Sequence, residues 1–279
     1  METIISPVDR TLLKKEMTEE LFVRDTNNGR NEIYIFTHEQ APNLMRELGR
    51  LREQTFRDAS GGTGKSCDID EWDVAKTPFK QLIVWNPEDE EIVGGYRFVV
   101  GRDVENDENG HPKTPTAHLF SLSKQYIDEY WPVTFELGRS FVQPIYQPTV
   151  NLRKGMYSLD NLWDGLGAIT VENPDVKYFF GKITMYPSYD TFARDMILFF
   201  MHKYFPDNDK LVVPREPVKV KIATPDKVLA SIFSGANYDE DYKILVQKVR
   251  RLGEGIPPLV NAYMNLSCSM RTFGTAINE

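Results

Sequence analysis

The segment ELGRSFVQP, residues 136–144, places two charged side chains on a run that otherwise has the composition of a β-strand. A charge on a strand is costly to bury unless it is paired or used in chemistry. Glu136 and Arg139 lie three residues apart, so strict alternation predicts that they point to opposite faces of a sheet. One of them must therefore face a core or a cleft, and this strand is the first place to look for an active site.

The order of apolar patterns predicts an α/β fold with a central mixed, twisted sheet flanked by helices. Strand-like alternation occurs in residues 31–37, 81–87, 90–101, 133–143 and 176–185, and helical spacing in residues 41–58, 122–131, 155–169, 189–205 and 242–252. Residues 81–87 and 90–101 are predicted to form a hairpin, and the Gly- and Asp-rich residues 60–73 a loop.

The pattern changes after Pro206. Residues 211–214 and 218–223 are typical of short strands, and residues 242–252 of a basic amphipathic helix. No flexible linker marks a boundary, so we expect a core over residues 1–205 and an extension over residues 206–279 that packs on it. The last residues are typical of an element that continues, so we also expect a truncated C-terminus.

Composition argues against several classes of function. With 41% hydrophobic and 27% charged residues the chain is ordinary for a globular protein, and its net charge of −8 argues against a general nucleic-acid-binding protein. Cys67, Cys268 and the histidines show no metal-site or triad spacing. No apolar run reaches the roughly 20 residues that span a bilayer. We expect a cytoplasmic protein without metal or bound cofactor, in peripheral contact with the membrane at most.

Four spaced motifs carry a resemblance to a known family. They are R-x-x-x-F (Arg52, Phe56), D-x-x-D (Asp70, Asp73), the arginine after G-G (Arg97) and E-L-G-R (Glu136, Arg139). In this order they resemble the GNAT-superfamily N-acyltransferases that acylate amino acids from acyl carrier protein, including the ornithine-lipid and glycine-lipid enzymes of the "putative haemolysin" group. More distant relatives are the acyl-homoserine-lactone synthases. The usual acyl-CoA signature is absent and NLRKG stands at residues 151–155, which favours a carrier-protein donor.

The resemblance implies a GNAT-like fold and the transfer of a fatty or 3-hydroxyacyl group to the α-amine of a small amino acid, glycine or ornithine. Glu136 is the candidate base, because the acceptor's ammonium must lose a proton before it attacks. The alternative for Glu136 is a structural ion pair with an arginine. The substrate-binding or framework candidates are Arg52, Phe56, Asp70, Asp73, Arg97 and Arg139. One arginine would bind the acceptor's carboxylate, or the whole cluster is architectural.

Other candidates concern the donor, a phosphopantetheine thioester of acyl carrier protein. Arg153, Lys154 and Gly155 precede a predicted helix and would bind the phosphate, or they form a solvated basic turn. By resemblance, strands 133–143 and 176–184 splay apart and the pantetheine arm pairs with one of them. The acyl-groove candidates are Phe141, Trp163, Phe179 and Phe180, with plain core packing as the alternative. The carrier-protein docking candidates are Lys243, Lys248, Arg250 and Arg251, with anionic headgroups or a solvated helix face as alternatives.

Two further functions fit the sequence. A signal synthase of the homoserine-lactone type would use S-adenosylmethionine as the acceptor. A catalytically silent GNAT-like module would bind lipid or carrier protein without acyl transfer. The leading interpretation is the N-acyltransferase, which would catalyse the first step in the synthesis of an amino-acid-containing lipid.

Overall fold

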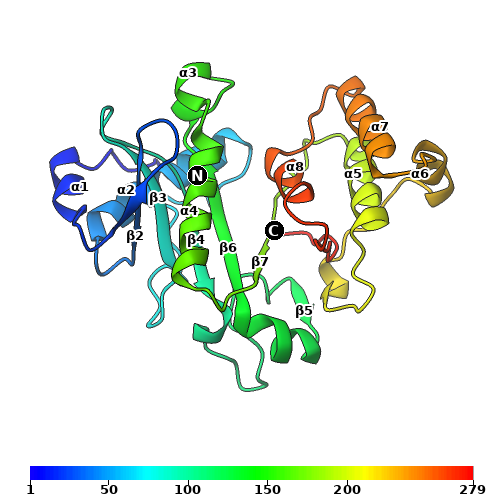
Figure 1. Cartoon of the computed structure of the whole chain (residues 1–279), viewed down its shortest axis with the longest axis horizontal. Coiled ribbons are helices and arrows are strands. Elements are labelled where there is room, and N and C mark those ends of the chain that lie inside the picture. The colour runs from blue at the N-terminus through cyan, green and yellow to red at the C-terminus, as the bar shows by residue number, and fades with distance from the viewer. Residues whose placement is uncertain (279) are drawn as a thin grey trace. The chain divides into compact units, whose positions relative to one another are not determined.

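The computed structural model describes residues 1–278 and divides the chain into two compact units (Figure 1). The first unit combines Met1–Pro112 with Tyr130–Lys182, and the second combines Lys113–Glu129 with Ile183–Glu279. The boundary expected after residue 205 falls inside the second unit. Helix α5 (Thr191–Tyr204), which we assigned to the core, packs against α7 (Tyr238–Arg251) in the second unit.

The first unit is built on a six-stranded sheet with the order β1-β2-β3-β4-β6-β7. Its strands are β1 (Phe22–Asp25), β2 (Glu32–Phe36), β3 (Lys80–Asn86), β4 (Glu91–Val100), β6 (Thr134–Val142) and β7 (Tyr178–Gly181). Neighbouring strands are antiparallel except β6 and β7, which are parallel. The predicted α/β class with a mixed sheet is therefore confirmed.

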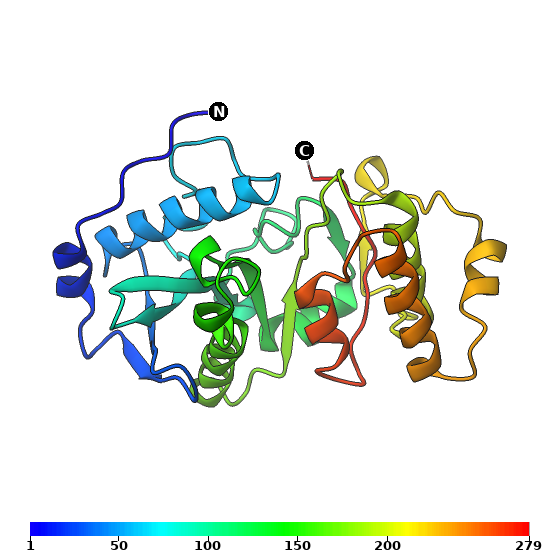
Figure 2. The same cartoon turned by 90° about the horizontal axis from the view of Figure 1, so that it is seen from above.

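Helices cover both faces of this sheet. They are α1 (Arg10–Glu16), α2 (Pro42–Asp58), α3 (Leu152–Gly155) and α4 (Ser158–Glu172). In Figure 2, α2 and α4 lie on opposite sides of the strands. Leu44 and Leu48 of α2 pack with Ile83 in one core cluster, while Leu162 of α4 packs with Leu82 in another. Successive residues of β3 thus pack into the cores on opposite faces of the sheet, as the alternation of side chains along a strand requires.

A β-bulge interrupts the pairing of β6 with β4. Arg97 is opposite Gly138 and Gly95 is opposite Phe141, so two steps along β4 match three steps along β6. The bulged Arg139 has a φ of 48°, in the left-handed region. The neighbouring Gly94 lets the strands approach closely here, because a Cβ on it would lie 2.4 Å from the carbonyl oxygen of Phe141.

The second unit is mainly helical. Its helices are α5, α6 (Asp226–Ile232), α7 and α8 (Pro258–Met264), and β5 (Phe120–Leu122) pairs antiparallel with β8 (Val212–Pro214). Phe200, Leu229 and Leu245 lie in its core. The helices predicted over residues 189–205 and 242–252 are confirmed.

The helix predicted over residues 122–131 is present over residues 124–130, with Tyr126–Tyr130 in the π-helical form. One expected element differs from the structure. The strand predicted over residues 218–223 is wrong, because Glu216–Val218 forms a 3-10 turn and Lys219 makes a single isolated bridge. Pro217 lies in this turn and has no N–H to donate to a β-ladder. Within residues 1–278, no helix is long and apolar enough to cross a membrane.

Candidate active site

Three arginines and three aspartates meet on the face of the sheet that α2 covers. Arg52 is fully buried on α2, and its Nη1 lies 3.3 Å from Oδ1 of the equally buried Asp73. Its Nη2 donates to Oε1 of Gln81 on β3. Gln81 in turn donates from Nε2 to Asp73 Oδ1 at 3.0 Å. These contacts tie the loop that carries Asp73 to both the helix and the sheet.

The other two arginines bind the same loop from the strands. Nη1 of Arg97 lies 2.6 Å from Asp70 Oδ1 and 3.3 Å from Asp73 Oδ1. On the bulge of β6, Arg139 places Nε 3.0 Å from Asp68 Oδ2 and Nη2 3.3 Å from Asp70 Oδ2. The structure therefore brings the five charged residues of the expected network together, and it adds Asp68, which the motifs had not indicated.

The bulge explains why Glu136 and Arg139 do not point to opposite faces. Val99 is opposite Glu136 in the ladder, and Arg97 lies two residues from Val99, so Arg97 and Glu136 share a face. Arg139 reaches the carboxylate of Asp70 that Arg97 also binds. The extra residue in β6 thus overrides the strict alternation that we expected.

Ionic contacts control the protonation of this network. Burial opposes ionisation of Asp73, but Arg52 and Arg97 outweigh it and lower its pKa to about 2. Burial also disfavours the charged form of Arg97, yet Asp73 and Asp70 raise its pKa above the ordinary value. Asp68 differs, because burial raises its pKa despite the nearby Arg139. Every arginine of the network contacts an aspartate, which favours an architectural role for the cluster.

We expect the network to contribute less to stability as the pH falls from about 4 to about 2. The pKa of Asp73 is lowered from 3.8 to about 2, so its contribution is present above 3.8 and is lost as the pH falls through 2. Urea unfolding of the wild type and Asp73→Asn measures the difference in free energy of unfolding at each pH. That difference should narrow over this range. A difference that stays constant from pH 4 to pH 2 would contradict the assignment.

Glu136 lies on β6 beside this network and close to the end of the β6–β7 pairing. It is opposite Phe180 on β7, and only 3% of the residue is exposed. The two strands pair only from Thr134 to Leu137 of β6, although β6 continues to Val142. The pairing therefore ends at the residue after Glu136. A carboxylate at this point can take a proton from an amine that is bound along the remaining edge of β6.

The four aromatic residues expected to line one acyl groove lie on two faces of the sheet. Phe141 belongs to the α2-side core, and Phe180 faces the same side. Phe179 stacks on a ring of the α4-side core with centroids 5.7 Å apart, and Trp163 packs against that core. Because neighbouring strand residues alternate, these four residues do not form a single groove.

Arg153, Lys154 and Gly155 precede helix α4, as expected, and themselves form most of the short helix α3. Asn151 Oδ1 accepts a hydrogen bond from the backbone N–H of Lys154 at 3.1 Å. The ammonium of Lys154 lies 2.7 Å from Asp89 Oδ2. Gly155 is buried where a Cβ would be 2.4 Å from a backbone nitrogen. The amide and charge of Lys154 are thus engaged within the protein, which favours the interpretation of this segment as a basic turn.

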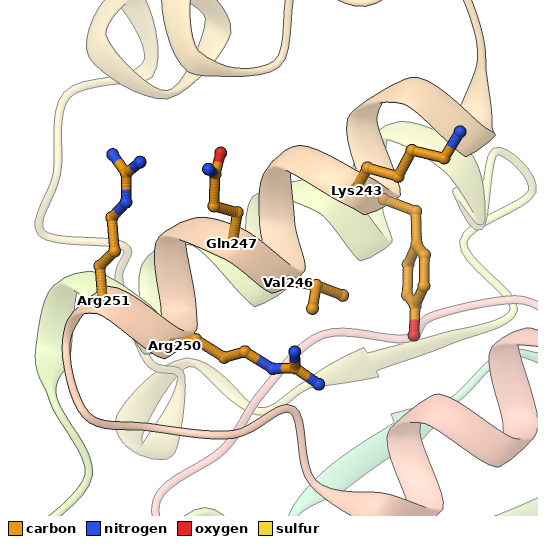
Figure 3. Close-up of a pocket in the computed structure, with 6 residues that line it drawn as sticks. Lys243, Val246, Gln247, Arg250 and Arg251 are labelled. Carbon is orange, nitrogen blue, oxygen red and sulfur yellow. The ribbon is translucent and has the colours of Figure 1, made fainter.

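In the second unit, α7 carries a basic, open hollow of about 510 Å³ (Figure 3). It is lined by Tyr242, Lys243, Val246, Gln247, Arg250 and Arg251. Arg250 and Arg251 lie seven and eight residues after Lys243, which is about two helical turns, so each of them lies near the face of Lys243. Lys248 is half-buried and does not line the hollow. Three of the four residues expected to dock a carrier protein therefore lie together.

The remaining site residues have different roles. Phe56, from the R-x-x-x-F motif, packs against the α2-side core. Lys182 directly follows β7 and lies electrostatically close to Glu136, although no motif pointed to it. Within residues 1–278, no group of three or more His, Cys, Asp or Glu side chains is arranged to hold a metal ion.

The mixed sheet with its short parallel β6–β7 ladder, flanked by helices, is the architecture that the sequence motifs led us to expect for an acyltransferase of the GNAT class. A family model described as "Acetyltransferase (GNAT) domain" matches residues 51–154. A protein of Phocaeicola vulgatus named glycine N(alpha)-acyltransferase is 56% identical over 278 residues, which cover 100% of this chain and 85% of that protein. A protein of the same name from Bacteroides thetaiotaomicron is 58% identical over 278 residues, covering 100% of this chain and 82% of that protein. No solved structure matches the chain. The chain belongs to the GNAT-superfamily N-acyltransferases.

Proposed function

We propose that this N-acyltransferase moves a fatty or 3-hydroxyacyl group from acyl carrier protein to the α-amine of glycine. The observation that carries the choice of acceptor is the name of the two relatives, glycine N(alpha)-acyltransferase, at 56% and 58% identity along the whole chain. The product is an N-acylglycine, a molecule with one acyl chain and one carboxylate. It would be the first intermediate of an amino-acid-containing lipid.

In this reaction Glu136 is the general base. The ammonium of glycine gives up a proton to Glu136, and the amine nitrogen then attacks the carbonyl carbon of the thioester. A C–N bond forms and the C–S bond breaks. The nitrogen loses its second proton as the tetrahedral intermediate collapses, and the departing pantetheine sulfur takes up that proton and leaves as the thiol, while the proton on Glu136 is released to solvent. The thioester is already activated, so no covalent enzyme intermediate is needed. The burial of Glu136 next to the end of the β6–β7 pairing supports this role.

The edge of β6 beyond Leu137 is the proposed binding site of the donor arm. Phosphopantetheine contains two amides, which can pair with a strand edge as an added strand would. Support comes from the ladder itself, since β7 ends at Gly181 opposite Leu137 while β6 runs on to Val142.

The test is acyl transfer by the purified protein. Acyl carrier protein loaded with a fatty or 3-hydroxyacyl group is mixed with glycine, ornithine or S-adenosylmethionine, and products are identified by mass spectrometry. We expect N-acylglycine to dominate. Acyl-homoserine lactone would favour a signal synthase, and no product from any acceptor would favour a silent binding module. Replacing the donor with acyl-CoA should lower kcat/KM.

Charge reversal on the α7 hollow should weaken the use of the carrier-protein donor. Acyl carrier protein is acidic, and loss of complementary rim charges lowers the association rate. We expect Arg250→Glu with Arg251→Glu to raise the KM for acyl carrier protein about tenfold or more at low salt. The KM for a short acyl-pantetheine thioester should not change.

Lys227→Glu is the matched control, because Lys227 is exposed on the neighbouring helix α6 of the same unit. If Lys227→Glu raised the KM for acyl carrier protein equally, the cause would be the net charge of the protein and not the position of the charges on α7. An equal rise for acyl-pantetheine would show that α7 acts on the chemistry and not on docking.

A further inference from the structure

The charged side chains near Glu136 fall into two groups. The first group is balanced, because the three arginines contact the three aspartates of the 68–73 segment: Arg52 with Asp73, Arg97 with Asp70 and Asp73, and Arg139 with Asp68 and Asp70. The second group consists of Glu136 and Lys182. Among the charges that act on Lys182, Glu136 has the largest effect. The arginines are therefore bound to the loop, while Lys182 is associated with the candidate base.

Strand geometry places Lys182 on the same face as Glu136. Phe180 is opposite Glu136 and Gly181 is opposite Leu137 in the parallel ladder. Lys182 follows immediately, two residues after Phe180, so alternation directs it to the face of Phe180 and Glu136. The lysine residue is exposed whereas Glu136 is buried. The ammonium of Lys182 is nevertheless surrounded by protein closely enough for burial to lower its pKa. A cation thus stands near a buried carboxylate at the place where the β6–β7 pairing ends.

A small amino acid presents the complementary pair of charges. Its carboxylate requires a cation or N–H donors, and its ammonium requires a proton acceptor before it can attack. These two groups are separated by a single carbon in glycine, so adjacent groups on the protein can address both at once. Asp68, Asp70 and Asp73 would repel the acceptor's carboxylate wherever their arginines did not neutralise them.

We propose that Lys182 binds the carboxylate of the acceptor amino acid while Glu136 faces its amine. This inference rests on the proposed function, because it assumes an amino-acid acceptor. It assigns recognition of the acceptor to a residue outside the four sequence motifs. It also gives the three arginines a purely structural role.

If Lys182 binds the acceptor, its loss of charge at alkaline pH should change the KM for glycine. A lysine with a purely structural role would not produce this pH dependence. Burial of its ammonium lowers the pKa of Lys182 to about 8, and the nearby Arg97 and Arg139 add to this shift. Glu136 and Asp70 oppose it. Lys182 is therefore mainly protonated at neutral pH and loses its charge as the pH rises through 8. The KM for glycine should accordingly rise above that pH.

The experiment compares glycine with glycinamide, in which a neutral amide replaces the carboxylate, at saturating acyl carrier protein. For Lys182→Met we expect the KM for glycine to rise about 10- to 100-fold, as for the loss of a hydrogen bond between charged groups. The KM for glycinamide should change by less than about twofold, because that ligand has no charge for Lys182 to bind. Lys177→Met is the matched control, since Lys177 is exposed five residues earlier and alternates to the other face.

Lys182→Arg keeps the charge and separates recognition from packing. It should keep most of the affinity for glycine and move the alkaline rise in KM to higher pH, because a guanidinium stays protonated. An equal rise in KM for glycine and glycinamide with Lys182→Met would overturn the inference. The inference would also be overturned if the KM for glycine rose with pH in the same way in the wild type and in Lys182→Arg. This second measurement does not depend on whether Lys182→Met folds.

Different results would contradict glycine as the acceptor and Lys182 as the group that binds its carboxylate. A wild-type enzyme that acylates another amino acid instead of glycine would overturn the proposed acceptor, and the same comparison with that amino acid and its amide would still decide the role of Lys182. A wild type that acylates glycine, with a glycine-to-glycinamide preference that Lys182→Met leaves intact, would overturn the role of Lys182 alone. A wild type that acylates no amino acid would overturn both.

Discussion

Glu136→Gln should lower kcat about 100- to 1,000-fold, the range expected when a positioned general base is lost. The amide of glutamine has nearly the same shape but cannot accept the ammonium proton at neutral pH. The KM for glycine should change much less than kcat, because in the proposed reaction Glu136 accepts the proton of the ammonium and does not bind the carboxylate. Steady-state kinetics with acyl carrier protein as donor measures both constants.

The matched control for this variant is Glu172→Gln, at the exposed end of α4. It should leave kcat unchanged. A thermal-unfolding midpoint for Glu136→Gln close to that of the wild type would separate catalysis from folding. A large loss of stability with an unchanged kcat in the folded fraction would instead make Glu136 a structural residue.

Arg52→Met should destabilise the first unit by about 3–5 kcal/mol, the usual cost of removing one partner of a buried ion pair. Both Arg52 and Asp73 have an exposed fraction of 0%. The variant leaves Gln81 without the guanidinium to which its carbonyl oxygen is bonded, and it leaves Asp73 with Arg97 as its remaining cation. Urea unfolding, followed by circular dichroism, gives the change in the free energy of unfolding.

Arg102→Met is the control, because it removes the same side chain from an arginine–aspartate pair at the surface. Its side chain is 37% exposed and that of Asp175 is 57% exposed. An exposed pair contributes about 0–1 kcal/mol, so this variant should unfold almost as the wild type does. Equal effects of the two substitutions would show that burial of the Arg52 pair does not determine its contribution.

The regular elements of the first unit follow directly from its sequence patterns. The period of 3.6 in residues 41–58 and the period of 2 in residues 81–87 and 90–101 correspond to α2, β3 and β4. These patterns are local, since each element presents one apolar face to its own side of the sheet. The bulge at Arg139 could not be predicted in this way, because it depends on how β6 is paired with β4.

In the site too, some features follow from local sequence patterns and others only from contacts between distant segments. The motifs identified the arginines of the network and two of its aspartates, because charged residues on strands and helices stand out from apolar surroundings. Asp68 and Gln81 join them only through contacts made across the fold. Lys182 lies electrostatically close to Glu136 because β7 pairs in parallel with β6 in one particular register. Register between distant strands is not encoded in any short segment, so neither propensity nor spacing could have indicated it.

The early end of the β6–β7 ladder has a consequence for how this enzyme behaves in solution. A strand edge with unpaired backbone groups is a template for any extended chain, including another copy of the protein. Beyond Leu137, β6 presents such an edge as far as Val142 on the side where β7 has ended. A donor arm bound there would occupy the same hydrogen-bonding groups. Enzyme stored with a non-reactive donor analogue should therefore self-associate less than enzyme stored alone.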